Sequence, residues 1–272
     1  MVTVLRPLST SELLDRTFHL YRNNFLMFVG IVAIPQLAVL ALQIGGAALV
    51  RQGHSVVFAF TTFVAAISSY VAIEISQAAT VMAVSNLHLD NPVSIGSAFS
   101  LSKGSMLRVI GITFAVGIAV GVAFIFLIIP GIYVALMWSL AIPVTVLEGG
   151  GLGVSTTRSK ELTKGSRGRI FVIYLLVGIL AFIASLVIQF PLQLIARSLG
   201  HGNPLSTTAL TQGMQATGTF ISTSLVGSLV TIALTLVYYD LRVRKEGFDL
   251  QLMMARLQPD SQAAAATAMA KI

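Results

Sequence analysis

One acidic residue lies within a long apolar segment and is the best candidate in this chain for chemistry inside a membrane. Tyr70 lies four residues before Glu74 and Gln77 three residues after it, so the three side chains share one face of a helix. A carboxyl group on such a stripe could face a polar cavity and there bind a proton or a substrate. The structural alternative is a neutral acid that hydrogen-bonds to Gln77, Tyr70 or a serine on a facing helix, or a residue that lies nearer the membrane interface. Trp138, on a later apolar segment, completes the candidate intramembrane polar site.

The rest of the sequence offers few groups for catalysis. It has no cysteine, and its four histidines lack the spacing of metal ligands. The stretch 149-GGGLG-153 lacks the Gly-Lys-Ser/Thr of a phosphate-binding loop and is typical of a flexible link. No HExxH or GxSxG motif occurs. We therefore expect no enzyme activity, no metal site and no cofactor.

The composition indicates that most of the chain is dissolved in lipid. Hydrophobic residues make up 56% of the 272 residues and charged residues only 10%, whereas a soluble domain has about 25% charged residues. A helix needs about 20 apolar residues to cross a hydrocarbon layer of about 30 Å. The chain is therefore predicted to be an all-α polytopic integral membrane protein. The predicted spans lie near 25–50, 56–84, 109–129, 132–147, 170–191 and 217–239.

The third and fourth predicted spans contain prolines and glycines that affect how they cross the membrane and pack. The fourth is short and contains Pro143, so it could instead be a tilted or partly embedded segment. The turn before it is predicted at Pro130-Gly131, which would make the two spans antiparallel neighbours. Gly117 and Gly121 of the third span form a GxxxG pair, which favours close packing on another helix of the same chain over a dimer face.

Positive charges fall into alternate loops of this arrangement. Loops on the cytoplasmic side of a membrane carry an excess of Lys and Arg. If the N-terminus is cytoplasmic, only Arg51 and Arg197 of the 17 Lys and Arg residues lie outside. We therefore predict that both termini are cytoplasmic. The net charge of +7 then needs no nucleic-acid partner to explain it.

A repeated motif precedes two of the spans. The stretch 103-KGSMLRVIG-111 aligns with 164-KGSRGRIFV-172, and each follows a short amphipathic segment. The stretch 9-STSELLDRTFHLYRNNF-25 precedes the first span in the same way, and its Ser9 and Glu12 form a capping box. We predict three repeats of an interfacial helix plus a transmembrane hairpin within one membrane domain, 1–257, and a disordered tail, 258–272. The interfacial helices are expected at 9–24, 94–106 and 155–166.

Basic residues next to the spans are predicted to contact anionic lipid headgroups. Each cation near an anionic membrane surface contributes about 1 kcal/mol to binding. The residues predicted to make these contacts are Arg16, Arg22, Lys103, Arg108, Lys164, Arg167, Arg169, Arg242, Arg244 and Lys245.

Three stretches resemble a known family. They are 5-LRPLSTSELLDRTFHLYRNNF-25, 138-WSLAIPVTVLEGGGLGVSTTRSKELTKGSRGRIF-171 and 238-YYDLRVRKEGFDLQLM-253, the last being the most specific. They are similar to the membrane domain of some bacterial glycerophosphoryl diester phosphodiesterases, which also exists as a stand-alone multispanning protein. The resemblance implies a protein of the bacterial cytoplasmic (inner) membrane. A separate barrel carries catalysis in the two-domain relatives, and only residues 241–272 follow Asp240 here, so no catalytic residue is transferred.

The sequence therefore favours a non-catalytic membrane protein, a scaffold or an accessory or regulatory component. Its basic cytoplasmic face would engage anionic lipid and could also hold a cytoplasmic or membrane protein partner. The alternative is a transporter or lipid-handling protein with an intramembrane site around Glu74.

Overall fold

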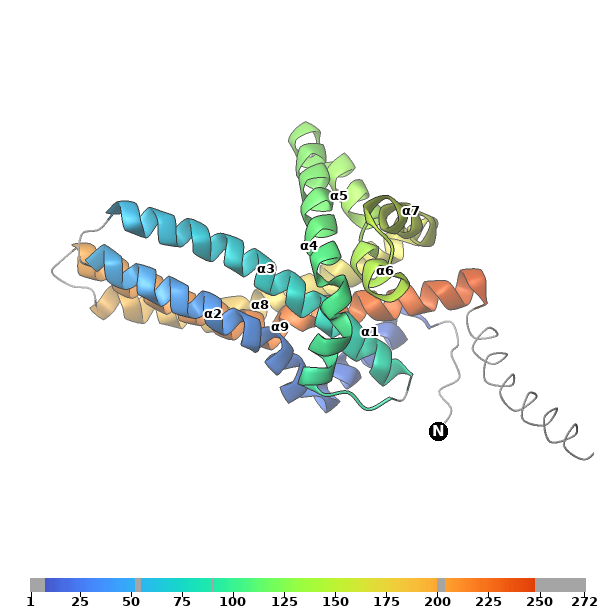
Figure 1. Ribbon diagram of the computed structural model, residues 1–272, viewed down its shortest axis with the longest axis horizontal. Helices are drawn as coiled ribbons and strands as arrows, with labels where there is room; N and C mark the ends of the chain where they lie inside the picture. The colour runs from blue at the N-terminus through green and yellow to red at the C-terminus, as the bar shows by residue number, and fades with distance from the viewer. Residues whose placement is uncertain (1–7, 52–54, 90, 200–203, 248–272) are drawn as a thin grey trace, which may run out of the picture.

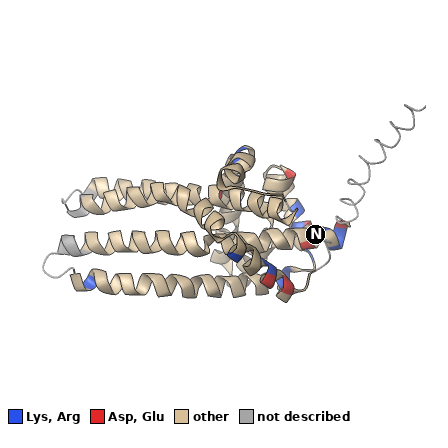
Figure 2. Ribbon diagram, turned by 90° about the horizontal axis from the view of Figure 1, so that it is seen from below, with Lys and Arg blue, Asp and Glu red and all other residues tan. Residues whose placement is uncertain are grey.

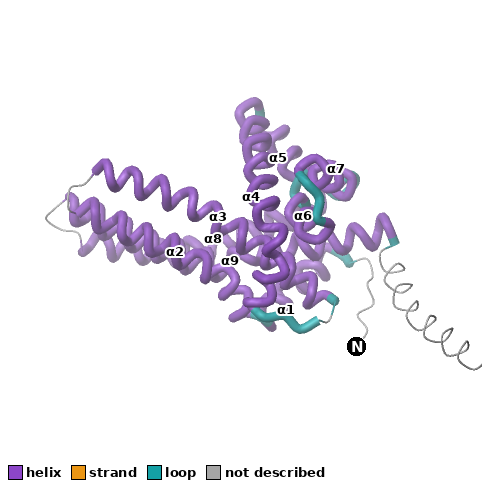
Figure 3. The backbone as a smooth tube through the Cα atoms, in the orientation of Figure 1, coloured by secondary structure: helices purple, strands orange, loops and turns teal. Residues whose placement is uncertain are grey.

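Helices account for nearly all of the described chain. The computed structural model describes residues 8–51, 55–89, 91–199 and 204–247, and within them the elements are helices joined by short connections (Figures 1 and 3). The helices are α1 (Thr10–Asn23), α2 (Phe25–Arg51), α3 (Ser55–His88), α4 (Ile95–Phe126), α5 (Ile128–Met137), α6 (Ala141–Glu148), α7 (Leu152–Thr163), α8 (Arg167–Leu199) and α9 (Pro204–Glu246).

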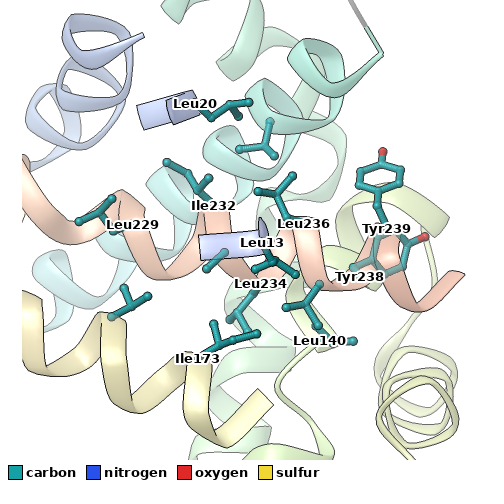
Figure 4. Packing of buried hydrophobic residues seen from close by; sticks show 14 of the residues in the cluster. Leu13, Leu20, Leu140, Ile173, Leu229, Ile232, Leu234, Leu236, Tyr238 and Tyr239 are labelled. Atoms are coloured by element: carbon teal, nitrogen blue, oxygen red, sulfur yellow. The ribbon is translucent and has the colours of Figure 1, made fainter. Parts of the chain in front are cut away.

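Four long helices form the main bundle, with α9 at its centre. Helix α9 packs against α2, α3 and α8, and α2 also packs against α3 (Figure 1). Residues 231–240 of α9 are all buried, as expected for a helix covered on every side. Leu13 and Leu20 of α1, Ile173 of α8 and Leu140 belong to the same core cluster as the apolar side chains of α9 (Figure 4).

The prediction of an all-α polytopic membrane protein is confirmed. Within the described residues, 6 helical segments are long and apolar enough to cross a membrane. They are Phe25–Ala48, Val56–His88, Ile95–Phe126, Ile128–Glu148, Arg167–Leu199 and Thr208–Glu246.

Several predicted boundaries are wrong because hydropathy marks only the part of a helix that lies in hydrocarbon. The segment 94–106 is not a separate interfacial helix but the first part of α4, which runs unbroken from Ile95. Helix α9 starts at Pro204 rather than near residue 217, and proline is well tolerated at the first position of a helix. The predicted helix 155–166 is present as α7, Leu152–Thr163. The predicted tail, 258–272, lies outside the described residues.

The two proline-containing connections also differ from the prediction. Helix α4 ends at Phe126, Leu127 is extended, and Pro130 already lies in the first turn of α5. The predicted turn at Pro130-Gly131 is therefore wrong. Pro143 likewise lies in the first turn of α6, so the fourth span is broken between Met137 and Ala141. Both breaks lie just upstream of a proline because its ring clashes with the carbonyl group four residues earlier.

Helix α4 and α5 form a hairpin that projects from the bundle at a steep angle (Figure 1). Its tip is apolar and open, with Ile125 83% and Ile129 81% exposed. The expected packing of Gly117 and Gly121 inside the chain is wrong, since a Cβ atom at either position would meet nothing within 4 Å. Gly131 makes the close helix contact instead, because a Cβ atom there would lie 2.4 Å from the ring of Phe124.

Helix α1 begins with the predicted capping box. The Glu12 backbone N–H donates to the Ser9 hydroxyl, and the Ser9 N–H donates to the Glu12 carboxylate at 2.7 Å. The helix packs on α9, burying Leu13, Thr17 and Leu20. A second apolar stripe, formed by Leu14, Phe18, Tyr21 and Phe25, is less buried, with Phe18 39% and Phe25 40% exposed.

Candidate functional site

Charged side chains gather at one end of the bundle (Figure 2). This basic end is where α2 and α8 begin and where α3 and α9 end. The opposite end, called the far end below, has two cations in the described helices, Arg51 at the end of α2 and Arg197 in the last turn of α8. The segregation follows from the sequence, because the lysines and arginines lie in alternate connections.

Asp240 is the most deeply buried charged group at the basic end. Its side chain is 0% exposed and accepts hydrogen bonds from Arg169 of α8 at 2.6 Å and from Arg244 at 2.9 Å. It also accepts from the Leu8 backbone N–H at 2.7 Å. The same two arginines donate to the Leu8 carbonyl, at 2.8 Å and 2.6 Å. The chain before α1 is thereby bound to α8 and α9.

A second group of charges joins the short helices to the end of α9. Arg158 of α7 pairs with Glu148 at 3.1 Å and with Glu246 at 2.5 Å. Glu148 also accepts from the Tyr238 hydroxyl at 2.8 Å, and Arg242 donates to that hydroxyl at 3.1 Å. Burial alone would lower the pKa of the Arg158 guanidinium, but its hydrogen bonds and the carboxylate charges outweigh burial and raise that pKa. The Arg158 guanidinium therefore keeps its positive charge at physiological pH.

These two groups form what we call the inner polar cluster. Its members are Leu8 through its backbone, and the side chains of Glu148, Arg158, Arg169, Tyr238, Asp240, Arg242, Arg244 and Glu246. They come from the three stretches that carry the family resemblance, 5–25, 138–171 and 238–253. Stretches far apart in the sequence thus meet at one place and bond to each other.

The predicted site residues did not include the acids of this cluster. The available signal was the i, i+4 spacing of Asp240 with Arg244 and of Arg242 with Glu246, which the structure uses as ion pairs. Nothing in the sequence pairs Asp240 with Arg169 or with Leu8, because 71 and 232 residues separate them.

Several residues predicted at lipid headgroups are bonded within the protein. Arg169, Arg242 and Arg244 belong to the inner polar cluster, and Lys245 donates to the carbonyl groups of Glu161 and Lys164 at 2.9 Å and 2.7 Å. Two more of the residues predicted at headgroups, Arg108 and Arg167, also contact other parts of the protein. Arg108 donates to the Gly149 carbonyl, and the Arg167 guanidinium lies 4.4 Å from the centre of the Tyr133 ring.

The other predicted headgroup residues are more open. Arg22, Lys103 and Lys164 are exposed, while Arg16 is half-buried and its Nε has no partner among the described residues. For the exposed three, headgroup contact stays a prediction.

Glu74 lies at the contact between α3 and α4. It is only 3% exposed, and the Thr113 hydroxyl of α4 lies within hydrogen-bonding reach of its carboxyl group. Its Oε2 has no hydrogen-bond partner among the described residues. Tyr70 faces the same helix and donates to the Ile110 carbonyl at 2.9 Å. Glu74 thus faces Thr113 of α4.

The other two residues of this predicted site are less closely placed. Gln77 is half-buried on the same helix, and Trp138 caps the end of α5 at the break before α6. None of the hydrogen bonds among the described residues joins either side chain to Glu74. The structure therefore supports Tyr70, Glu74 and Thr113 as neighbours, and Thr113 is a residue that sequence periodicity missed.

A separate cavity opens at the far end between α2, α3 and α9. It has a volume of about 320 Å³ and lies near Gln43 and Thr61 rather than Glu74. We call it the far-end cavity. The prediction singled out none of its polar residues as a site.

The fold and these sites together define the class of the protein: an all-α, multi-pass membrane protein with a charged end held together by internal ion pairs. No protein-family model, curated protein or solved structure matches the chain.

Proposed function

We propose that this protein is a non-catalytic component of the bacterial cytoplasmic membrane, a scaffold or accessory subunit whose basic end lies in the cytoplasm and binds anionic lipid. The resemblance of three stretches to the glycerophosphoryl diester phosphodiesterase membrane domain supports this setting. The strong charge difference between the two ends supports the orientation (Figure 2).

One observation carries the proposal: three acids of the basic end already have internal partners. Asp240, Glu148 and Glu246 are all bonded to arginines of the same chain. The exposed lysines nearby, Lys103, Lys160 and Lys164, form no ion pair with these three acids and are open at the surface. Exposed cations beside apolar spans are placed to meet anionic headgroups.

A neutralisation series tests the lipid contact. We expect the triple variant Lys103→Gln, Lys160→Gln, Lys164→Gln to retain phosphatidylglycerol about a hundredfold more weakly, because each cation contributes about 1 kcal/mol. The measurement is native mass spectrometry of protein released from nanodiscs of phosphatidylcholine and phosphatidylglycerol. The control replaces the same three lysines by arginine, which keeps the charge. Equal retention by the two triple variants would contradict the proposal.

A labelling experiment tests the orientation. The chain has no native cysteine, so single cysteines report without background. We expect Arg197→Cys to react with an impermeant thiol reagent in intact cells and Gly153→Cys to react only after the cells are opened. Gly153 suits this purpose because a side chain there meets nothing within 4 Å, whereas at Gly150 it would press on Val154 at 2.9 Å. The reverse pattern would place the basic end outside.

The second candidate function is transport or lipid handling around Glu74. It is favoured by the unpartnered Oε2 of this buried carboxyl group, since ionisable residues inside membranes usually have a functional role. The closed contact with α4 is, by contrast, what a structural residue would make. The two variants of Glu74 that separate these functions are described in the Discussion.

A further inference from the structure

The far-end cavity has polar walls although it lies between membrane helices. Figure 1 shows α3 diverging from α2 and α9 toward the far end, and the cavity of about 320 Å³ lies between these three helices. This volume is in the range of small-molecule sites, about 300–1,000 Å³. Its polar lining residues are Gln43, Thr61, Thr62, Gln212, Gln215 and Thr219.

The depth of the cavity follows from residue counts along the three helices. The Ser85 and Tyr239 hydroxyls, 2.7 Å apart, mark one level of α3 and α9 near the basic end, and Phe25 starts α2 at that end. About 20 residues cross the hydrocarbon layer. About 20 residues before Ser85 lies Ala65 of α3, and the same distance before Tyr239 lies Thr219 of α9. The position at the same distance after Phe25 lies next to Gly46 of α2. Ala65, Thr219 and Gly46 all line the cavity. All three helices thus place the cavity where hydrocarbon meets the far headgroup layer.

The lining groups are suited to an uncharged, hydrogen-bonding ligand. Glutamine amides and threonine hydroxyls both donate and accept hydrogen bonds. The amides of Gln43, Gln212 and Gln215 make no hydrogen bond to any described residue, so their capacity is open to a ligand or water. Among the described lining residues there is no Lys, Arg, Asp or Glu, so these residues offer no cation to a phosphate group.

The cavity also has the apolar groups that a lipid would need. Leu42, Phe58 and Ala66 line it together with the polar side chains. Leu42, Ala66 and Thr219 are exposed at the surface, so the cavity communicates with the lipid-facing side of the bundle. A soluble polar solute would make no use of these apolar walls.

We propose that the far-end cavity binds the uncharged, hydroxyl-bearing head of a membrane lipid, with diacylglycerol as the simplest member of that class. The Gln and Thr side chains hydrogen-bond the glycerol hydroxyl and ester groups, and the acyl chains leave along the exposed apolar rim. This site is independent of the basic end, which is proposed to bind anionic lipid at the opposite membrane surface.

The test uses nanodiscs of phosphatidylcholine that contain dioleoylglycerol and phosphatidylglycerol as minor components. Native mass spectrometry is expected to find dioleoylglycerol retained by the wild-type protein. The variant Gln212→Leu, Gln215→Leu removes two hydrogen-bonding side chains and is expected to lower this retention at least about tenfold, since each lost bond contributes about 1 kcal/mol. Thr219→Leu, at an exposed rim position, is expected to act in the same direction by filling the cavity.

The control is Gln193→Leu on α8, the same chemical change at a similar depth but outside the cavity. It should retain dioleoylglycerol as the wild type does, and all variants should retain phosphatidylglycerol unchanged. No preferential retention by the wild type, or an equal loss in Gln193→Leu, would overturn the proposal. The lysine variants test only the binding of phosphatidylglycerol at the basic end, and the glutamine variants test only the binding of dioleoylglycerol in the cavity. Either proposal can therefore fail while the other holds.

Discussion

Asp240→Asn is expected to lower the free energy of unfolding by about 3–5 kcal/mol, the usual effect of breaking a buried ion pair from one side. The side chain of Asp240 is 0% exposed and bonds to Arg169, Arg244 and the Leu8 N–H. Without its charge, two guanidinium groups at the helix junction lose their shared counter-ion. The loss is measured by denaturant titration of the protein in mixed micelles.

Two further variants separate the ionic contribution from a general effect of mutation. Asp15→Asn changes an exposed acid of α1 and should alter stability by no more than about 0.5 kcal/mol. The triple variant Asp240→Leu, Arg169→Met, Arg244→Met should recover part of the loss, because it leaves no unpaired charge. A loss of less than about 1 kcal/mol in Asp240→Asn would show that the cluster does not hold the basic end together.

Glu74→Leu is expected to raise the free energy of unfolding by about 1–3 kcal/mol. A charged side chain near the bilayer centre costs about 2.5–3.5 kcal/mol on insertion scales, and leucine of similar size removes that cost. Thr113 lies within hydrogen-bonding reach of the Glu74 carboxyl, and the Glu74 Oε2 has no hydrogen-bond partner among the described residues, so little is lost in exchange. Glu74→Gln keeps the shape and polarity of the side chain and should change stability less. Both are measured by the same titration.

The pair of Glu74 variants also decides between the two proposed functions. If the stabilised Glu74→Leu protein and the Glu74→Gln protein both support the normal phenotype of the host, the residue is structural and the transport proposal fails. If both fold but lose the phenotype, the carboxyl group is functional and the scaffold proposal fails. Gln193→Leu serves as the control for a polar-to-apolar change in a span. Destabilisation of Glu74→Leu by more than about 1 kcal/mol would contradict the stability prediction.

The fold class could be predicted because it depends on local properties of the chain. Each apolar stretch long enough to cross hydrocarbon must satisfy its own backbone hydrogen bonds, so it forms a helix whatever its neighbours are. The start of α1 was predictable for the same reason, since Ser9 and Glu12 lie within one turn of each other. The segregation of cations to one end also follows from their positions along the chain.

The helix boundaries were less predictable because hydropathy reports the solvent of a residue rather than its backbone conformation. The polar residues from Pro204 onward continue α9 beyond the hydrocarbon, and Lys103-Gly104-Ser105 lies inside α4. The matching Lys164-Gly165-Ser166 instead separates α7 from α8, with Gly165 at φ +82°. The same three residues thus adopt two conformations, so this tripeptide by itself does not set a helix boundary.

By itself the sequence determined an all-α membrane protein with Glu74 inside an apolar segment and with one strongly basic end. Only the tertiary structure decided that Asp240 binds Arg169 and Leu8, that Thr113 faces Glu74, and that a polar cavity lies between α2, α3 and α9. The physical reason is that apolar length sets where helices form, whereas the direction of each polar side chain depends on how the helices cross. Helix packing in a membrane depends on how closely the surfaces of two helices fit together, which the order of apolar residues does not specify.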